Sequence, residues 1–555
     1  MHHQITCLAP RSHTRRTFLS ATVATVAAAI LAACGDASAP TVTVAPTVPA
    51  SSTTTSSPTA PIAAAPASNT PAIPRMTAQP TGELRIVVAS YPNTLDALKE
   101  TNVLRFGLGE TLMRLSPQYK LEPWLAQSLT NVDPLTWRVA LRPNAKFWDG
   151  TPVTADAVIA AFRRDWEAYP NANALISKDT RLTAVDPTTV EFKTPKQIGA
   201  FPNALAASSF IVHKPQVEGG ADGSILTGPY RVTKFAVDGE FTLEPNRNHW
   251  GGPPPIARIT VKKVVDPSAE AIALQAGDTD LIYRVPPEVT KGLGNEFTVS
   301  AIPSTIVDQI NLNLRHSPLD DRAVREATAW AIDRATLINV GLDGKGIPAP
   351  GALPPNLDND VVTWQITDRA RTAQLLDDAG WKIGNDGVRA KNGKRLAFTL
   401  LSGDPAQPEL AAFAVSIQQQ LKPLGYDLTI TQVQNVNDAT KAGTFDAVLR
   451  SSNSLQTGDP LFALDRLFAV GGASNTGGYT NPQIIGLLDQ LRPEIDSVKR
   501  QALSQQIQEL ARADIPDIFL TVIPLVVAYR TKTLKRFVPH PDDTYLISSD
   551  WLAVN

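Results

Sequence analysis

Cysteine is almost absent from this chain of 555 residues, which contains only two. Both of them, Cys7 and Cys34, lie near the amino terminus, so the rest of the chain can form neither a disulfide nor a thiolate metal site. Basic charge is not in excess, because 51 Lys and Arg residues face 53 Asp and Glu residues. This balance argues against a nucleic-acid partner. After residue 33, no apolar run approaches the roughly 20 residues of a membrane-spanning helix, and residues 518–528 predict a buried strand instead.

The residue patterns of common enzymes are also missing. Beyond residue 34 the chain has four histidines, and their spacing is not that of a zinc site: His213, His249, His316 and His540. We expect these histidines in loops or at the surface. No GxSxG sequence is present, and the Gly-rich segment 341–351 lacks the spacing and the Ser or Thr of a phosphate-binding loop. We therefore predict a protein that is not an enzyme and uses no metal or cofactor.

The amino terminus has the composition of an export signal. Residues 1–13 contain Arg11 and no acid, and the apolar segment 21–33 is too short to span a membrane. The string TRRTFLS at 14–20 resembles the twin-arginine signal, with Arg15 and Arg16 as its pair. The string LAAC at 31–34 resembles the bacterial lipobox. Together these resemblances imply a signal peptide at 1–33 and a lipid attached to Cys34, which would hold the protein on the outer side of the cell membrane.

Residues 34–80 differ in composition from the remainder of the chain. They are mainly Pro, Thr, Ser and Ala, they contain no aromatic residue, and their only charged residues are Asp36 and Arg75. A segment of this kind cannot bury a core, and its prolines favour an extended backbone. The composition predicts a disordered tether.

Patterns typical of strands and helices alternate beyond residue 80. Residues 83–90 and 136–141 alternate in hydropathy and predict strands. Thr154 is placed to cap the helix that follows, in which Val158 and Phe162 fall on one face.

Two further helices are expected later in the chain. One contains Asp321 and Arg325, which are paired one turn apart on its surface, and Thr367 caps the other. This alternation predicts an α/β fold in which helices cover the sheets.

One family accounts for most of the chain. The stretch LRPNAKFWDGTPVTADAVIAAFRR at 141–164 resembles the signature region of the family 5 extracellular solute-binding proteins of ABC importers, which bind dipeptides, oligopeptides or nickel. LTGPYRVTKF at 226–235, LLDDAGW at 375–381 and FDAVL at 445–449 match in the same order, and the resemblance spans 82–555. Residues 317–338 resemble the single helix that opens the second lobe in this family. The resemblance implies a two-lobed, periplasmic-binding-protein-like fold (class II, cluster C) with hinge strands and a central ligand cleft.

The resemblance also implies how the domains are divided. The first lobe would comprise 81–310 and 515–555, with an inserted subdomain at about 113–225. The second lobe would comprise 311–514.

Two loops supply the candidate solute-binding residues. Tyr91 and Asn93 lie where the family has a loop facing the cleft, although they could equally form a turn. The second loop follows the FDAVL strand, and its candidates are Arg450, Ser452, Asn453 and Gln456.

Gln456 bears on the choice of solute. In the oligopeptide binders an Asp near this position pairs with the α-ammonium of the peptide, whereas this chain has Gln456 followed by Thr457. Because a neutral amide cannot neutralise a desolvated ammonium, a peptide with a free amine is disfavoured. Hydroxyls, carbonyls or an acid suit these side chains better.

The sequence thus predicts a monomeric, lipid-anchored receptor on the extracytoplasmic side of the membrane. It would close its lobes on a small peptide-like or other organic solute and pass this solute to an ABC permease. Two alternatives stay open: an enzyme exported by the twin-arginine route, and a sensor that does not transport.

Overall fold

The computed structural model of the protein describes residues 79–215, 223–237, 239–355, 362–364, 366–403, 407–548 and 552–554. The expected signal peptide with Arg15 and Arg16, the lipid-bearing Cys34 and nearly all of the tether lie outside the described residues. No helix within the described ranges combines the length and the apolar character needed to cross a membrane.

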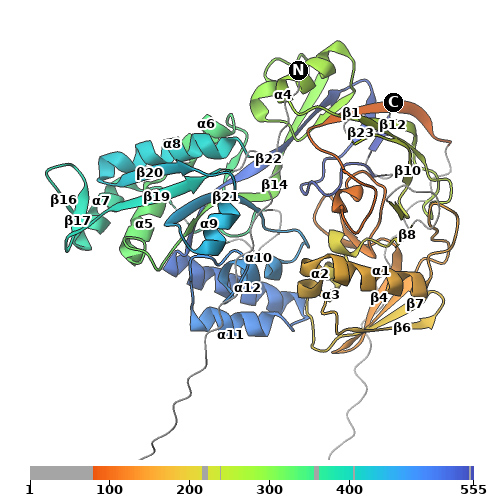
Figure 1. The fold of residues 1–555 in the computed structure, drawn as a ribbon, viewed down its shortest axis with the longest axis horizontal. Coiled ribbons are helices and arrows are strands. Elements are labelled where there is room, and N and C mark those ends of the chain that lie inside the picture. The colour runs from red at the N-terminus through yellow and green to blue at the C-terminus, as the bar shows by residue number, and fades with distance from the viewer. Residues whose placement is uncertain are drawn as a thin grey trace, which may run out of the picture. The chain divides into compact units, whose positions relative to one another are not determined.

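A mixed sheet of eleven strands organises the described part of the chain (Figure 1). In spatial order its strands are β10 (Tyr230–Phe235), β11 (Glu240–Pro245), β12 (Ile256–Lys263), β1 (Thr81–Val88), β13 (Leu281–Tyr283), β22 (Asp517–Arg530), β14 (Phe297–Leu312), β21 (Ala447–Asn453), β19 (Ala397–Ser402) and β20 (Asp427–Gln432), and β15 (Ile347–Pro348) pairs with β22 beside this path. Strands β12, β1 and β13 run parallel to one another, as do β21, β19 and β20.

Strands β14 and β22 connect two lobes. Leu525 of β22 belongs to the core of the first lobe, whereas Ile518 belongs to a core of the second lobe. Pro303 of β14 lies opposite Pro524 of β22, and the register between the strands shifts just after this pair. Since neither proline has an N–H to donate, this pair contributes no N–H donor to the ladder. The predicted two-lobed α/β fold with hinge strands is confirmed.

The first lobe contains the half of the sheet from β10 to β13 and a second, antiparallel sheet. The antiparallel sheet has the order β4 (Ala126–Asp133), β5 (Thr136–Leu141), β7 (Thr189–Lys193) and β6 (Arg181–Asp186). The helices and 3₁₀ turns of this lobe are α1 (Ala155–Ala168), α2 (Pro170–Leu175), α3 (Phe201–Ala204), α4 (Pro267–Ala276), η1 (Thr101–Val103), η2 (Ser208–Phe210) and η3 (Pro287–Thr290). Phe162 of α1 stacks on Phe210 with ring centroids 4.6 Å apart, which fixes α1 against η2.

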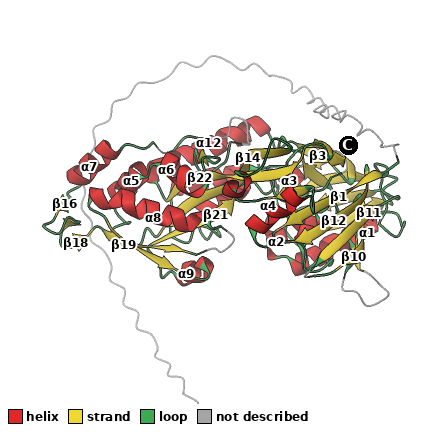
Figure 2. Ribbon diagram, turned by 90° about the horizontal axis from the view of Figure 1, so that it is seen from above, coloured by secondary structure: helices red, strands yellow, loops and turns green. Residues whose placement is uncertain are grey.

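Helices line the strands of the second lobe (Figure 2). They are α5 (Arg322–Ala331), α6 (Arg334–Gly341), α7 (Arg369–Asp378), α8 (Glu409–Leu421), η4 (Lys422–Leu424), α9 (Val436–Ala442), α10 (Pro460–Phe468), α11 (Pro482–Leu491) and α12 (Ser497–Asp514). One core, which includes Phe413 of α8, lies on the side of α5, α6 and α8, and another, which includes Phe468 of α10, lies on the side of α10 to α12.

Short hairpins complete the described elements. They are β2 (Met113–Leu115) with β3 (Leu121–Pro123), β8 (Lys214–Pro215) with β9 (Ser224–Ile225), β16 (Lys382–Ile383) with β17 (Arg389–Lys391) and β18 (Lys394–Arg395), and β23 (Leu534–Phe537) with β24 (Leu552–Val554).

The helix predicted after the second strand is confirmed. Thr154 accepts a hydrogen bond from the Ala157 N–H at 3.2 Å, and Val158 and Phe162 are buried. The prediction of one helix over 317–338 is wrong, because α5 ends at Ala331 and Asp333 caps α6.

Two side-chain expectations in the same region are also wrong. Arg325 is buried and donates to the carbonyls of Leu319 and Ile515, so it does not pair with Asp321, which caps α5. The cap of α7 is Asp368, while the Thr367 hydroxyl donates to the Ile332 carbonyl at 3.0 Å.

Candidate functional site

Two cavities lie between the lobes, where strands from both lobes end. In sheets with parallel strands, ligands bind beyond the carboxyl ends of the strands. Arg284 directly follows β13 of the first lobe, and Asn453 is the last residue of β21 of the second lobe. Arg284 lines one cavity and Asn453 lines the other.

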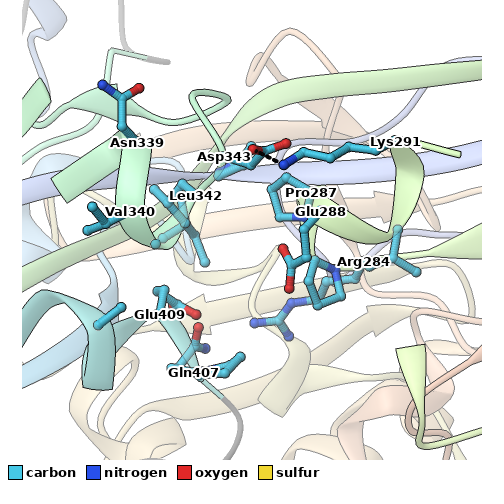
Figure 3. Close-up of a pocket in the computed structure, with 17 residues that line it drawn as sticks. Arg284, Pro287, Glu288, Lys291, Asn339, Val340, Leu342, Asp343, Gln407 and Glu409 are labelled. Carbon is cyan, nitrogen blue, oxygen red and sulfur yellow. Dashed lines mark ion pairs between the residues drawn. The ribbon is translucent and has the colours of Figure 1, made fainter. Parts of the chain in front are cut away.

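The larger cavity has a volume of about 470 Å³ (Figure 3). From the first lobe it is lined by 284–288 and Lys291, from the hinge by Ile523 and Pro524, and from the second lobe by 339–343, 407–409 and Ala412. Its size falls within the range of about 300–1,000 Å³ found for small-molecule sites. Because both lobes and the hinge form its wall, any movement of the lobes changes this cavity.

Charged side chains connect the lobes along the larger cavity. The Lys291 ammonium of the first lobe lies 2.6 Å from Asp343 Oδ1 of the second lobe, and this pair is drawn in Figure 3. A hydrogen bond from Lys291, together with its positive charge, lowers the pKa of Asp343. Lys345 of the second lobe donates to the Pro287 carbonyl and to the Thr290 hydroxyl, both at 3.3 Å. These contacts hold the lobes in the observed arrangement.

The smaller cavity has a volume of about 200 Å³. Its lining residues are Thr101, Asn102, Arg105, Ser208, Asn453, Gln456, Asp543 and Thr544. Apart from one Arg and one Asp, all of these are neutral side chains that can both donate and accept hydrogen bonds. The wall of this cavity therefore suits a neutral polar group.

A cluster of three charged residues, Arg105, Asp543 and Arg284, connects the walls of the two cavities. Asp543 Oδ2 lies 2.9 Å from Arg105 Nη2 and 2.7 Å from Arg284 Nη1. Arg105 and Asp543 line the smaller cavity, whereas Arg284 lines the larger one. Arg105 Nε also donates to the Asp543 carbonyl at 2.6 Å, so the carboxylate is held through both its main chain and its side chain.

The residue before Asp543 is fixed below the surface. Asp542 accepts hydrogen bonds from the Thr544 hydroxyl at 2.7 Å and from the Tyr119 hydroxyl at 3.3 Å. Burial and the neighbouring Asp543 charge raise the pKa of Asp542. The hydrogen bonds of the buried Asp542 therefore hold the loop that carries Asp543 in place.

The structure brings two of the predicted solute-binding residues, Asn453 and Gln456, into one cavity. Ser452 and Arg450 lie on β21 outside both cavities: Arg466 Nη2 donates to the Ser452 hydroxyl at 3.3 Å, and Arg450 Nη2 donates to Asn437 Oδ1 at 3.5 Å.

The other two predicted residues are in neither cavity. The Tyr91 hydroxyl donates to the Ala236 carbonyl at 2.6 Å and accepts from the Gly239 N–H at 2.9 Å, and Asn93 is exposed. Through these hydrogen bonds Tyr91 connects the segment after β1 to the β10–β11 hairpin, which is a structural role. A role in solute binding stays a prediction for Tyr91, Asn93, Arg450, Ser452, Asn453 and Gln456 alike.

Several cavity residues were not predicted from the sequence. Arg284 could have been found, because it directly follows a buried strand that runs parallel to the first strand. Arg105 and Asp543 are separated by 438 positions, and no local pattern relates them. Their proximity is produced by the last loop of the chain packing on the segment after η1, where the N–H groups of Leu546 and Ile547 both bond to the Arg105 carbonyl.

All four histidines lie in loops, as expected, although three of them are not at the surface. His213, His249 and His540 are buried, and their rings lie within hydrogen-bond distance of main-chain or carboxylate oxygens. Burial lowers the pKa of His213 and of His540 to about 4, which keeps both neutral. No group of three or more His, Cys, Asp or Glu residues in the described ranges is arranged to hold a metal ion.

A buried acid lies in the hinge region near these cavities. Asp308 of β14 is fully buried and accepts hydrogen bonds, both at 2.5 Å, from the hydroxyls of Ser451 on β21 and Thr521 on β22. Burial raises the pKa of Asp308 to about 7, although the two hydroxyl donors oppose this shift. The three strands are thus joined by side chains as well as by the ladder.

Comparisons with known proteins agree with this geometry. The family model described as bacterial extracellular solute-binding proteins, family 5 Middle, matches residues 120–475. The glutathione-binding protein GsiB of Pectobacterium atrosepticum is 29% identical over 475 residues, which cover 81% of this chain and 89% of that protein.

Solved structures show the same fold. NikA from Staphylococcus aureus in complex with Ni(L-His)2 matches with a TM-score of 0.70 and 21% identity, covering 85% of this chain and 99% of that one. The oligopeptide-binding protein AppA from Bacillus subtilis in complex with a nonapeptide matches with a TM-score of 0.68 and 22% identity, with the same coverage. These relatives are solute-binding proteins and not enzymes. From the matching family model, the shared fold and the cavities between its lobes, we conclude that this chain belongs to the bacterial extracellular solute-binding proteins of family 5.

Proposed function

We propose that this protein is the lipid-anchored receptor of an ABC importer. It closes its two lobes on a small polar solute outside the cytoplasm and delivers the solute to a membrane permease. The observation that carries the proposal is the pair of cavities, each of which has a wall shared by the first lobe and the second lobe. A solute in such a cavity contacts both lobes at once, and therefore favours the closed arrangement by its differential affinity.

The relatives support the transport role. GsiB is named for glutathione, and the NikA and AppA structures contain a nickel–histidine complex and a nonapeptide. All of these ligands carry polar groups. The smaller cavity offers side chains that can form hydrogen bonds with such groups, among them Asn453 and Gln456. We assign these two residues to the solute site, together with Tyr91, Asn93, Arg450 and Ser452 as further candidates from the sequence.

Attachment to the membrane is proposed from the sequence. Arg15 and Arg16 direct export, cleavage of the signal peptide 1–33 exposes Cys34 for lipid attachment, and 34–80 form the tether. The remaining chain forms a first lobe of 81–310 and 515–555, which includes the subdomain at about 113–225, and a second lobe of 311–514. We propose that the receptor acts as a monomer.

Small-angle scattering of the protein that lacks residues 1–80 tests lobe closure. Native mass spectrometry of the purified protein first identifies the solute that copurifies with it. Removal of this solute should increase the radius of gyration, and its return at saturation should restore the smaller value. A radius that is unchanged by saturation contradicts closure of the lobes.

Substitution of the smaller-cavity amides tests the site. The double variant Asn453→Ala with Gln456→Ala should weaken binding of the copurified solute about tenfold or more, since each lost hydrogen bond contributes about 0.5–1.5 kcal/mol. Titration calorimetry measures this change. Gln483→Ala on the exposed surface of α11 is the matched control and should bind as the wild type does.

A further inference from the structure

The geometry points to Arg284 and Asp543 as a partition that limits the length of the solute. This inference rests on the proposed function and deepens it, because it assigns to the cleft a compact polar solute that fits the smaller cavity, which Asn453 and Gln456 line. An extended chain running through both cavities would be excluded. Nothing in the family match specifies such a limit.

The position of the ion pair carries the first step of the argument. Arg284 belongs to the wall of the larger cavity and Asp543 to the wall of the smaller one, and Nη1 of the arginine lies 2.7 Å from Oδ2 of the aspartate. The side chains that separate the two spaces are therefore in direct contact. A solute that occupied both spaces would have to displace this contact.

The second step is that both partners are held in place. Arg105 binds Asp543 through its carboxylate at 2.9 Å and through its carbonyl at 2.6 Å, and the Arg105 side chain is only 11% exposed. On the other side, with the Gln407 amide oriented to satisfy its neighbours, its oxygen accepts from Arg284 Nη2 at 3.3 Å. Figure 3 shows the Arg284 guanidinium extending toward Gln407 at the wall of the cavity.

The backbone at Arg284 gives the third step. Arg284 has a φ of 60°, in the left-handed region that few residues other than glycine adopt. The Val285 N–H bonds to the Val526 carbonyl at 3.2 Å, which fixes the chain directly after this residue. Backbone conformations of this kind are kept where the surrounding structure determines them, and here the conformation projects a cation between two cavities.

Charge explains why the partition persists without a solute. Two guanidinium groups share the carboxylate of Asp543, and hydrogen bonds between ionised groups are roughly twice as strong as those between neutral groups. The side chains of Asp543 and Arg284 are 20% and 37% exposed, so the pair is only partly screened by water. Removing Asp543 would leave Arg284 without its carboxylate, and removing Arg284 would leave Asp543 bound to Arg105 alone.

The volumes set the expected limit. A compact space of 200 Å³, the volume of the smaller cavity, is about 6 Å across, and an extended peptide advances about 3.3–3.6 Å per residue. About two residues of an extended backbone, or another solute of similar length, would fill it. The wild-type protein should therefore prefer short solutes over longer ones of the same chemistry.

Arg284→Gly is the decisive variant. Glycine removes the partitioning side chain and is compatible with the positive φ, so the fold should be retained. Asp543→Ala removes the other partner. Arg138→Ala is the matched control, because Arg138 forms an ion pair of similar length, 2.9 Å to Glu191, on the first lobe and lines neither cavity.

The experiment is native mass spectrometry after incubation with three solute mixtures. These are alanine peptides from the dipeptide to the octapeptide, cello-oligosaccharides from the disaccharide to the hexasaccharide, and the small-molecule fraction of a bacterial culture medium. In every mixture that binds, the wild type and Arg138→Ala should retain only short members. Arg284→Gly and Asp543→Ala should raise the affinity for longer members, relative to short ones, by tenfold or more.

The outcomes separate the partition from the proposed function. Identical length profiles for the wild type and both cavity variants overturn the partition, as does retention of long members by the wild type, while either result leaves solute binding intact. Failure of every variant and of the wild type to retain any component of the three mixtures overturns the proposed function itself. Far-ultraviolet circular dichroism and urea unfolding check that each variant is folded.

Discussion

Arg500 and Asp459 form a buried ion pair behind the loop that carries Gln456. Arg500 Nη2 lies 2.6 Å and 2.7 Å from the two Asp459 oxygens, and both side chains are 9% exposed. Asp459 also accepts from the Leu461 N–H at 2.9 Å and so caps α10. One carboxylate thus connects α12, α10 and the loop next to the smaller cavity.

Loss of the arginine should destabilise the protein strongly. Arg500→Ala leaves the Asp459 carboxylate buried without its partner, and we expect the free energy of unfolding to fall by about 3–5 kcal/mol in urea titrations. Arg138→Ala, which breaks an exposed pair, should cost less than about 1 kcal/mol. Equal effects of the two substitutions would contradict this role of burial.

Asp308 makes stability depend on pH. Burial raises its pKa from 3.8 to about 7, so the folded protein keeps a proton that the unfolded chain releases near pH 4. The stability contributed by this group is therefore complete below pH 4, is lost as the pH rises toward 7, and changes little above that.

Asp308→Asn removes this titration. Relative to the wild type, the variant should gain up to about 4 kcal/mol between pH 4 and pH 8, because each pKa unit corresponds to about 1.36 kcal/mol. Urea unfolding at both pH values measures the gain. Part of the dependence should remain, since burial also raises the pKa of Asp517 to about 7 and that of Glu270 to about 8. The exposed Asp438→Asn is the control, and an unchanged slope in Asp308→Asn would contradict the assignment.

At the scale of elements, the capping bond of α1 can be tested by itself. Thr154→Ala removes the acceptor for the Ala157 N–H, and we expect a loss of about 1 kcal/mol in the free energy of unfolding. Thr154→Ser keeps a hydroxyl at the cap and should recover most of this loss. If both variants unfold at the same urea concentration, the cap does not stabilise the helix.

Elements defined by neighbouring residues could be predicted, and those defined by distant contacts could not. The helix after Thr154 and the strand over 136–141 follow from local patterns, and the structure has both. Just after the break between α5 and α6, Arg334 is buried and donates to the Phe519 carbonyl, 185 positions away, at 2.9 Å. Local helical periodicity contains no information about that carbonyl.

The candidate site also has residues that could be predicted from the sequence and residues that could not. Asn453 and Gln456 were predicted because a family resemblance located their loop, and they line one cavity. Arg105 and Asp543 meet only through the packing of segments from opposite ends of the described chain. The volume and the separation of the cavities arise from such long-range contacts, so sequence patterns could not supply them.

At the scale of the whole molecule, the lipid anchor gives a further prediction. Cys34→Ser removes the only cysteine that would remain after cleavage of residues 1–33, and the protein should move from the membrane pellet to the soluble fraction of lysed cells. Cys7→Ser is the matched control, because it lies in the segment to be removed. Immunoblotting of the two fractions measures the shift, and a variant that still pellets with the membrane would contradict the anchor.

The place of β22 in the sheet affects how the protein is made. This strand is formed by residues Asp517–Arg530, close to the carboxyl terminus, yet it lies between β13 and β14 in the middle of the sheet. During synthesis, neither lobe has its full set of strands until residue 530 has left the ribosome. Strand pairing between distant residues is also intrinsically slow. Translation products that lack β22 should therefore fail to reach the native state. A chaperone that shields the unpaired edges of β13 and β14 would have to stay bound until β22 has been made.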